Sequence, residues 1–190
     1  MMGSYDKTKK MRRIESPEEK LYNQLNTEEY KKRPYEYEDL GEGMGVIGET
    51  MWGWWKHRYL LNHNTKCAYE IMDRSQRLCT VTKDDIDWES IRELPEDAQR
   101  RARAFSFHFP SFIRSFKNGV AEVSWQLNPD GRYYMDEDGY GMTDDVEVTI
   151  YGFINQNGKA VVKFRNINED YKELDNMRKE AEEIVKNKKK

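Results

Sequence analysis

An acidic segment in the second half of the chain carries carboxylates at the spacing of a calcium-binding loop. The ligand positions 1, 3, 9 and 12 of such a loop fall on Asp136, Asp138, Asp144 and Glu147. Gly141 stands at position 6, where the loop turns sharply, but Tyr140 occupies position 5, which needs an oxygen ligand. The flanking residues have the pattern of strands, not of helices. We therefore expect a solvated loop between two strands, with binding of calcium or another divalent cation as the alternative.

Catalytic chemistry has no local support in the sequence. The three histidines are His57, His63 and His108, and the first two are too far apart for one helical face at i and i+4. No G-x-S-x-G, P-loop or H-E-x-x-H motif occurs. The sequence thus favours a protein without catalysis. An enzyme or a small-ligand-binding protein, with a pocket between helices and sheet, is the second hypothesis.

A glycine pattern, G-x-G-x-x-G, spans residues 43–48. In a dinucleotide-binding fold this pattern follows a buried strand and opens a helix. Residues 35–39 before it are strongly acidic and would repel a pyrophosphate, and no second β-α-β unit follows. We expect a glycine-rich loop that leads into an aromatic helix over residues 49–61, and we expect no cofactor.

Aromatic and flexible side chains gather on turns beside the acidic loop. They are Arg132, Tyr133, Tyr134, Tyr140 and Met142. Tyrosines among Gly and Asp, on loops held by a rigid sheet, are typical of binding surfaces. We expect this acidic, tyrosine-rich sheet end to bind a protein partner. The alternative is that the aromatic residues build the core of a chain that is short of aliphatic side chains.

Basic residues support a third and weaker hypothesis, which is nucleic-acid binding. Arg100, Arg101 and Arg103 lie close together, and both ends of the chain are rich in lysine. Against it, the chain has 32 Lys and Arg, 35 Asp and Glu, and a net charge of -3. A dedicated nucleic-acid binder normally has a basic excess, so we expect nucleic acid not to be the partner.

The sequence patterns of the strands and helices that must position these residues predict an α+β fold. Alternating residues over about 120–166, with Asn-Pro-Asp-Gly and Asn-Gln-Asn-Gly turns, predict a three- to four-stranded antiparallel meander packed against helices. Ser16, Pro17 and Glu19 predict a helix start and a helix to about Lys32. A C-terminal helix is expected over 168–188. Five phenylalanines in residues 105–116 are expected, with the helices, to cover the apolar face of the meander.

We expect the chain to divide into a disordered tail, 1–15, and a single α+β domain, 16–190. Within that domain the patterns predict a helix and a glycine-rich loop over 16–48, a mainly helical part over 49–116, the sheet over 120–166, and the C-terminal helix.

The polar composition and the lack of an apolar secretory signal in the first residues lead us to expect a soluble cytoplasmic protein. No apolar run approaches the roughly 20 residues that span a bilayer, and the first residues lack the apolar core of a secretory signal. The two cysteines, Cys67 and Cys79, do not have a metal-binding spacing, and the reducing cytosol is the expected compartment, with one disulfide between them as the alternative. The combined expectation is a small intracellular interaction or regulatory protein, whose oligomeric state the sequence leaves open.

Overall fold

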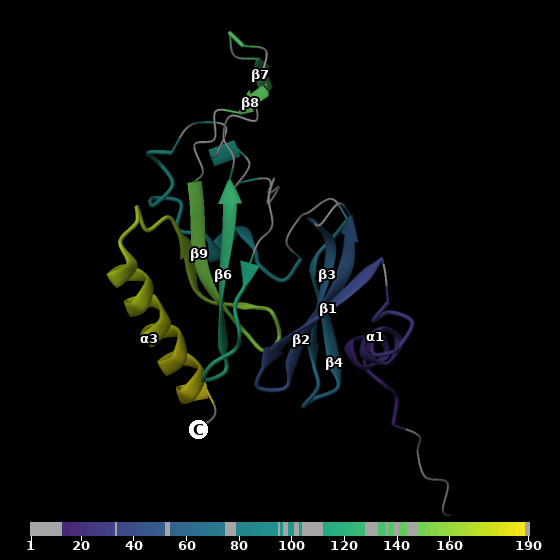
Figure 1. Cartoon of the computed structure of the whole chain (residues 1–190). Helices are drawn as coiled ribbons and strands as arrows, with labels where there is room; N and C mark the ends of the chain where they lie inside the picture. The colour runs from purple at the N-terminus through teal and green to yellow at the C-terminus, as the bar shows by residue number, and fades with distance from the viewer. Residues whose placement is uncertain are drawn as a thin grey trace, which may run out of the picture.

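Two four-stranded antiparallel sheets face each other, and each carries a helix on its outer side (Figure 1). The computed structural model describes residues 13–32, 34–51, 54–74, 79–94, 96, 99–100, 103, 112–127, 133–135, 137–138, 141–143 and 148–188. The layers follow the order α1, first sheet, second sheet, α3. The α+β class that the sequence predicts is therefore confirmed.

The first sheet is built from consecutive strands in the order β1-β2-β3-β4. Their bounds are β1 Tyr35–Gly41, β2 Met44–Met51, β3 Trp54–Asn62 and β4 Cys67–Met72. The predicted glycine-rich loop and the predicted helix over 49–61 are wrong, because both segments are strands. The prediction that residues 49–116 are mainly helical is likewise wrong for the first third of that range, which contains β3 and β4. Further along, Lys83–Asp85 forms one 3-10 turn (η1) within the range that was predicted to be mainly helical.

The second sheet has the order β10-β9-β6-β5. Its strands are β5 Phe112–Ile113, β6 Val120–Leu127, β9 Val148–Asn155 and β10 Ala160–Arg165. Pairing of β6 with β9 and of β9 with β10 confirms the core of the predicted meander. The strand predicted to return after β6 pairs elsewhere: β7 Tyr133–Met135 joins β8 Gly141–Thr143 in a separate two-stranded ribbon.

The main core lies between the two sheets. Leu40, Met44, Val46, Leu60 and Ile71 of the first sheet meet Trp125, Ile150, Ile154 and Phe164 of the second. Among the described residues, the first sheet therefore supplies most of the cover of the meander. Phe116 from that block is buried in this core, whereas Phe105, Phe107 and Phe109 lie outside the described residues.

Two helices seal the outer faces. α1, Pro17–Leu25, starts as predicted: the Ser16 hydroxyl accepts from the Glu19 amide at 3.2 Å, and the Glu19 carboxylate accepts from the Ser16 amide at 2.8 Å. It ends at Leu25, about two turns before the predicted Lys32. α3, Tyr171–Lys188, confirms the C-terminal helix and buries Leu174, Met177 and Ala181 against the second sheet.

The turns of the two sheets are tied to each other. The Glu42 carboxylate, in the β1–β2 turn, accepts from the backbone amides of Asn118 at 2.7 Å and Gly119 at 2.9 Å. The amide of Phe116 donates to the Leu40 carbonyl at 2.6 Å. These bonds fix the first sheet to the segment that leads into β6. Within the described part of the chain, no helix is both long and apolar enough to cross a membrane.

Candidate functional site

The predicted partner surface falls on the β7–β8 ribbon, which lies beyond the ends of β6 and β9 and away from both large sheets (Figure 1). Tyr134 pairs in register with Met142, and Tyr133 with Thr143. Arg132 and Tyr140 lie outside the described residues. The structure thus brings three of the five predicted residues onto one ribbon.

The predicted cation loop connects and follows the same ribbon. Asp138 is an exposed turn residue, whereas Asp136, Asp144 and Glu147 are outside the described residues. Among the residues that the structure does describe, no group of three or more His, Cys, Asp or Glu side chains could hold a metal ion.

The predicted nucleic-acid residues lie in a helical turn before the second sheet. Arg100 and Arg103 are exposed, and Arg101 is outside the described residues. The Arg103 guanidinium lies 6.0 Å from the ring centre of Trp88 and donates to the Gln99 side-chain oxygen at 3.4 Å. Arg103 is therefore held against the protein surface by its neighbours.

His57 is hydrogen-bonded to a carboxylate on the outer face of the first sheet. Its Nε2 lies 2.7 Å from Glu70 Oε1, and its ring meets the Tyr59 ring edge-on, with centroids 4.4 Å apart. Burial, assisted by the nearby Glu70 carboxylate, raises the pKa of Tyr59 to about 12. The Glu70 carboxylate orients the His57 ring, as a carboxylate orients the base in many nucleophilic catalytic sites. Among the described residues, however, no serine hydroxyl or cysteine thiol is hydrogen-bonded to His57.

His63 lies between two tyrosines. Tyr22 Oη of α1 is 2.8 Å from Nδ1, and Tyr37 Oη of β1 is 3.0 Å from Nε2. Asn26 donates to Tyr22 Oη at 3.2 Å, so the tyrosine hydroxyl can donate to Nδ1 while accepting from the amide. This network docks α1 onto the sheet. His108 lies outside the described residues.

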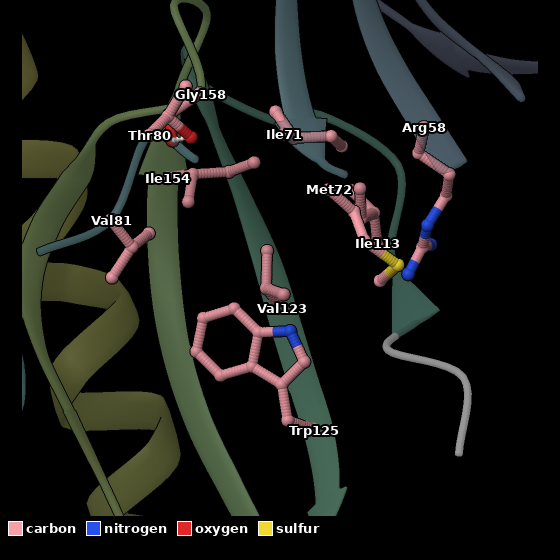
Figure 2. Close-up of a pocket in the computed structure, with 10 residues that line it drawn as sticks. All are labelled: Arg58, Ile71, Met72, Thr80, Val81, Ile113, Val123, Trp125, Ile154 and Gly158. Carbon is pink, nitrogen blue, oxygen red and sulfur yellow. Dashed lines mark hydrogen bonds between the residues drawn. The ribbon is translucent and has the colours of Figure 1, made fainter. Parts of the chain in front are cut away.

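A small cavity of about 20 Å³ lies between the sheets, as Figure 2 shows. Apolar side chains of both sheets surround it, among them Met72, Ile113 and Trp125, and the Arg58 guanidinium points towards Met72 and Ile113. Burial lowers the pKa of Arg58 to about 10, although the Glu38 carboxylate partly offsets that effect. The volume suffices for roughly one water molecule, so this cavity is too small for an organic ligand.

A larger hollow, of about 150 Å³, opens between α3 and the second sheet. It is lined by Arg114, Ser115, Lys117, Val120, Glu122, Phe153, Arg178 and Glu182. Glu122 is only 6% exposed and accepts from Arg114 Nε at 3.0 Å and from Arg178 Nη2 at 2.7 Å. Sequence alternation places Glu122 on the polar face of β6, but it contains no sign that α3 covers that face.

Comparison of the chain with protein-family models, with curated proteins and with solved structures finds no match in any of the three.

Proposed function

We propose that the chain is a small, non-catalytic interaction protein that binds a protein partner through the β7–β8 ribbon and the acidic loop within it. The observation that supports this most directly is the separateness of the ribbon, which pairs with neither large sheet. A two-stranded ribbon alone is only marginally stable in water. Docking onto a partner would supply the burial that such a ribbon lacks.

Charge indicates the kind of surface that the partner presents. Residues 128–147 include seven acidic residues and one arginine. A strongly negative segment attracts a basic surface and accelerates association with it. Tyrosine supplies contact area at a low cost in side-chain entropy. The proposed partner therefore has a basic patch, and Arg132, Tyr133, Tyr134, Tyr140 and Met142 are the proposed contact residues.

An intracellular, cytoplasmic setting is part of this proposal. Cys67 and Cys79 are not joined by a disulfide. Disulfides are rare in reducing compartments, where glutathione and thioredoxin prevent their formation.

The test is affinity capture from the native host, with partners identified by mass spectrometry. The bait proteins are the parent chain, Tyr134→Ala and, as a matched control, Tyr171→Ala. Tyr171 is 63% exposed on α3, on a different part of the molecule (Figure 1). We expect at least one partner to be lost with Tyr134→Ala, kept with Tyr171→Ala, and released by raised salt. An identical set of partners from all three baits would overturn the proposal.

A further inference from the structure

The hollow between α3 and the second sheet gathers cations from two elements that are far apart in the sequence. Arg114 and Lys117 come from the segment that joins β5 to β6, and Arg178 comes from the middle of α3. Ser115 adds a hydroxyl group, and the buried ring of Phe153 forms part of the wall. These residues do not belong to the β7–β8 ribbon.

Glu122 orients the two arginines. Its buried carboxylate accepts from Arg114 Nε and Arg178 Nη2, while Arg178 Nη1 donates to Asp175 Oδ1 at 3.3 Å. The Arg178 guanidinium also lies 5.8 Å from the ring centre of Phe153. A guanidinium has five N–H donors in a rigid plane. Arg178 is thus held by two carboxylates and the Phe153 ring, whereas Arg114, whose side chain is 73% exposed, is held by Glu122 through Nε. Both arginines keep donors after these bonds to described residues.

The side chains that line the hollow carry one more positive than negative charge. Arg114, Lys117 and Arg178 oppose the carboxylates of Glu122 and Glu182, and Asp175, outside the lining, also pairs with Arg178. The Lys117 ammonium makes no ion pair with any described residue, although it lines the same space. The bond between Arg178 and Glu122 is enough to attach α3 to the second sheet. Lys117 and Ser115, which also line the hollow, are not needed for that attachment.

From this arrangement we propose that the hollow is a binding site for a phosphoryl group. Three cations and a hydroxyl, converging from two elements, suit a tetrahedral anion with several acceptor oxygens better than a planar carboxylate. The volume of about 150 Å³ is below the 300–1,000 Å³ of typical small-molecule pockets. The hollow itself therefore accommodates a phosphate ion or the phosphoryl head of a monoester.

The experiment is titration of the full-length chain with inorganic phosphate, phenyl phosphate and acetate, followed by calorimetry and by amide NMR shifts at constant ionic strength. Three variants each change one charge: Lys117→Gln and Glu182→Gln inside the hollow, and Lys163→Gln as the control. Lys163 is an exposed residue of β10 that does not line the hollow. None of the three is part of the Glu122 network, so folding should be preserved, and thermal unfolding checks this.

We expect Lys117→Gln to weaken phosphate binding about three- to tenfold, because one charge-assisted contact is lost. Glu182→Gln should tighten it by a similar factor, since a repelling carboxylate is removed, and Lys163→Gln should leave it unchanged. Binding of phenyl phosphate as well as phosphate would identify a monoester as the ligand, and binding of phosphate alone would identify the free ion.

Three results would overturn the proposal: no phosphate binding, acetate binding as tight as phosphate, or equal affinity in all three variants. The outcome is independent of the β7–β8 ribbon, so either proposal can fail without the other.

Discussion

Gly152 of β9 is the position where a single methyl group should do the most damage. A Cβ built there would overlap the ring carbons Cδ1 and Cε1 of Phe164. The ring has no free space to move into, because Phe164 is 0% exposed and its centroid lies 4.2 Å from that of Trp125. Overpacking a well-filled core typically lowers the free energy of unfolding by about 1–3 kcal/mol. Because the Phe164 ring is enclosed, we expect Gly152→Ala to lower it by about 3 kcal/mol.

Urea unfolding measures this loss. With an m-value of about 2 kcal/mol per molar urea, a loss of about 3 kcal/mol lowers the midpoint by about 1.5 M. Phe164→Leu alone should cost only roughly 1 kcal/mol, which is about the difference between typical Phe→Ala and Leu→Ala losses. In the double variant the smaller side chain makes room for the new methyl group, so the combined loss should be at least about 1 kcal/mol smaller than the sum. An unchanged midpoint for Gly152→Ala, or strict additivity in the double variant, would refute the packing argument.

Two further predictions concern α1 and the outer face of the first sheet. Ser16→Ala removes the hydroxyl that accepts from the Glu19 amide and should lower the free energy of unfolding by about 1 kcal/mol in the same urea assay, and an equal midpoint would contradict the role of the cap. Tyr59, whose pKa is raised from 10.0 to about 12, stays protonated in the folded protein at pH values where the unfolded chain ionises. Its contribution to stability is therefore complete below pH 10 and is lost as the pH rises towards 12. Tyr59→Phe should flatten this alkaline loss of stability, and pH-dependent unfolding curves of equal steepness for both proteins would contradict the raised pKa.

The second half of the chain was predictable because local signals and the fold agree there. Ala121, Val123 and Trp125 alternate with polar residues and do line the core. The Asn155–Gly158 turn also forms: the Asn155 side chain accepts from the amides of Asn157 and Lys159, and Gly158 has a φ of +74° that glycine adopts without strain.

The sequence of the first half led to a wrong prediction of helices because its central strands are buried on both faces. Leu60 and Leu61 of β3 are adjacent, yet both are 0% exposed, one towards the second sheet and the other towards α1. A strand buried on both faces loses the period-two alternation that identifies strands, and its apolar residues then match helical spacing equally well.

The hollow beside α3 has no local signature in the sequence. Glu122 meets Arg114 eight residues earlier and Arg178 fifty-six residues later. That association depends on α3 folding back over the second sheet, which no spacing within a single segment indicates. Part of the predicted partner surface could be located because its residues lie on one hairpin, where pairing is local.

The order of the two sheets along the chain has a consequence for synthesis on the ribosome. All strands of the first sheet precede those of the second, yet its inner face is covered by residues as late as Phe164. When only β1–β4 of a nascent chain have left the ribosome, Leu40, Val46 and Leu60 are therefore exposed to water or bound by a chaperone until the remaining strands emerge. Any pause in translation between the end of β4 and the end of β10 lengthens that exposed interval, and aggregation during expression should increase when codons in that stretch are slow.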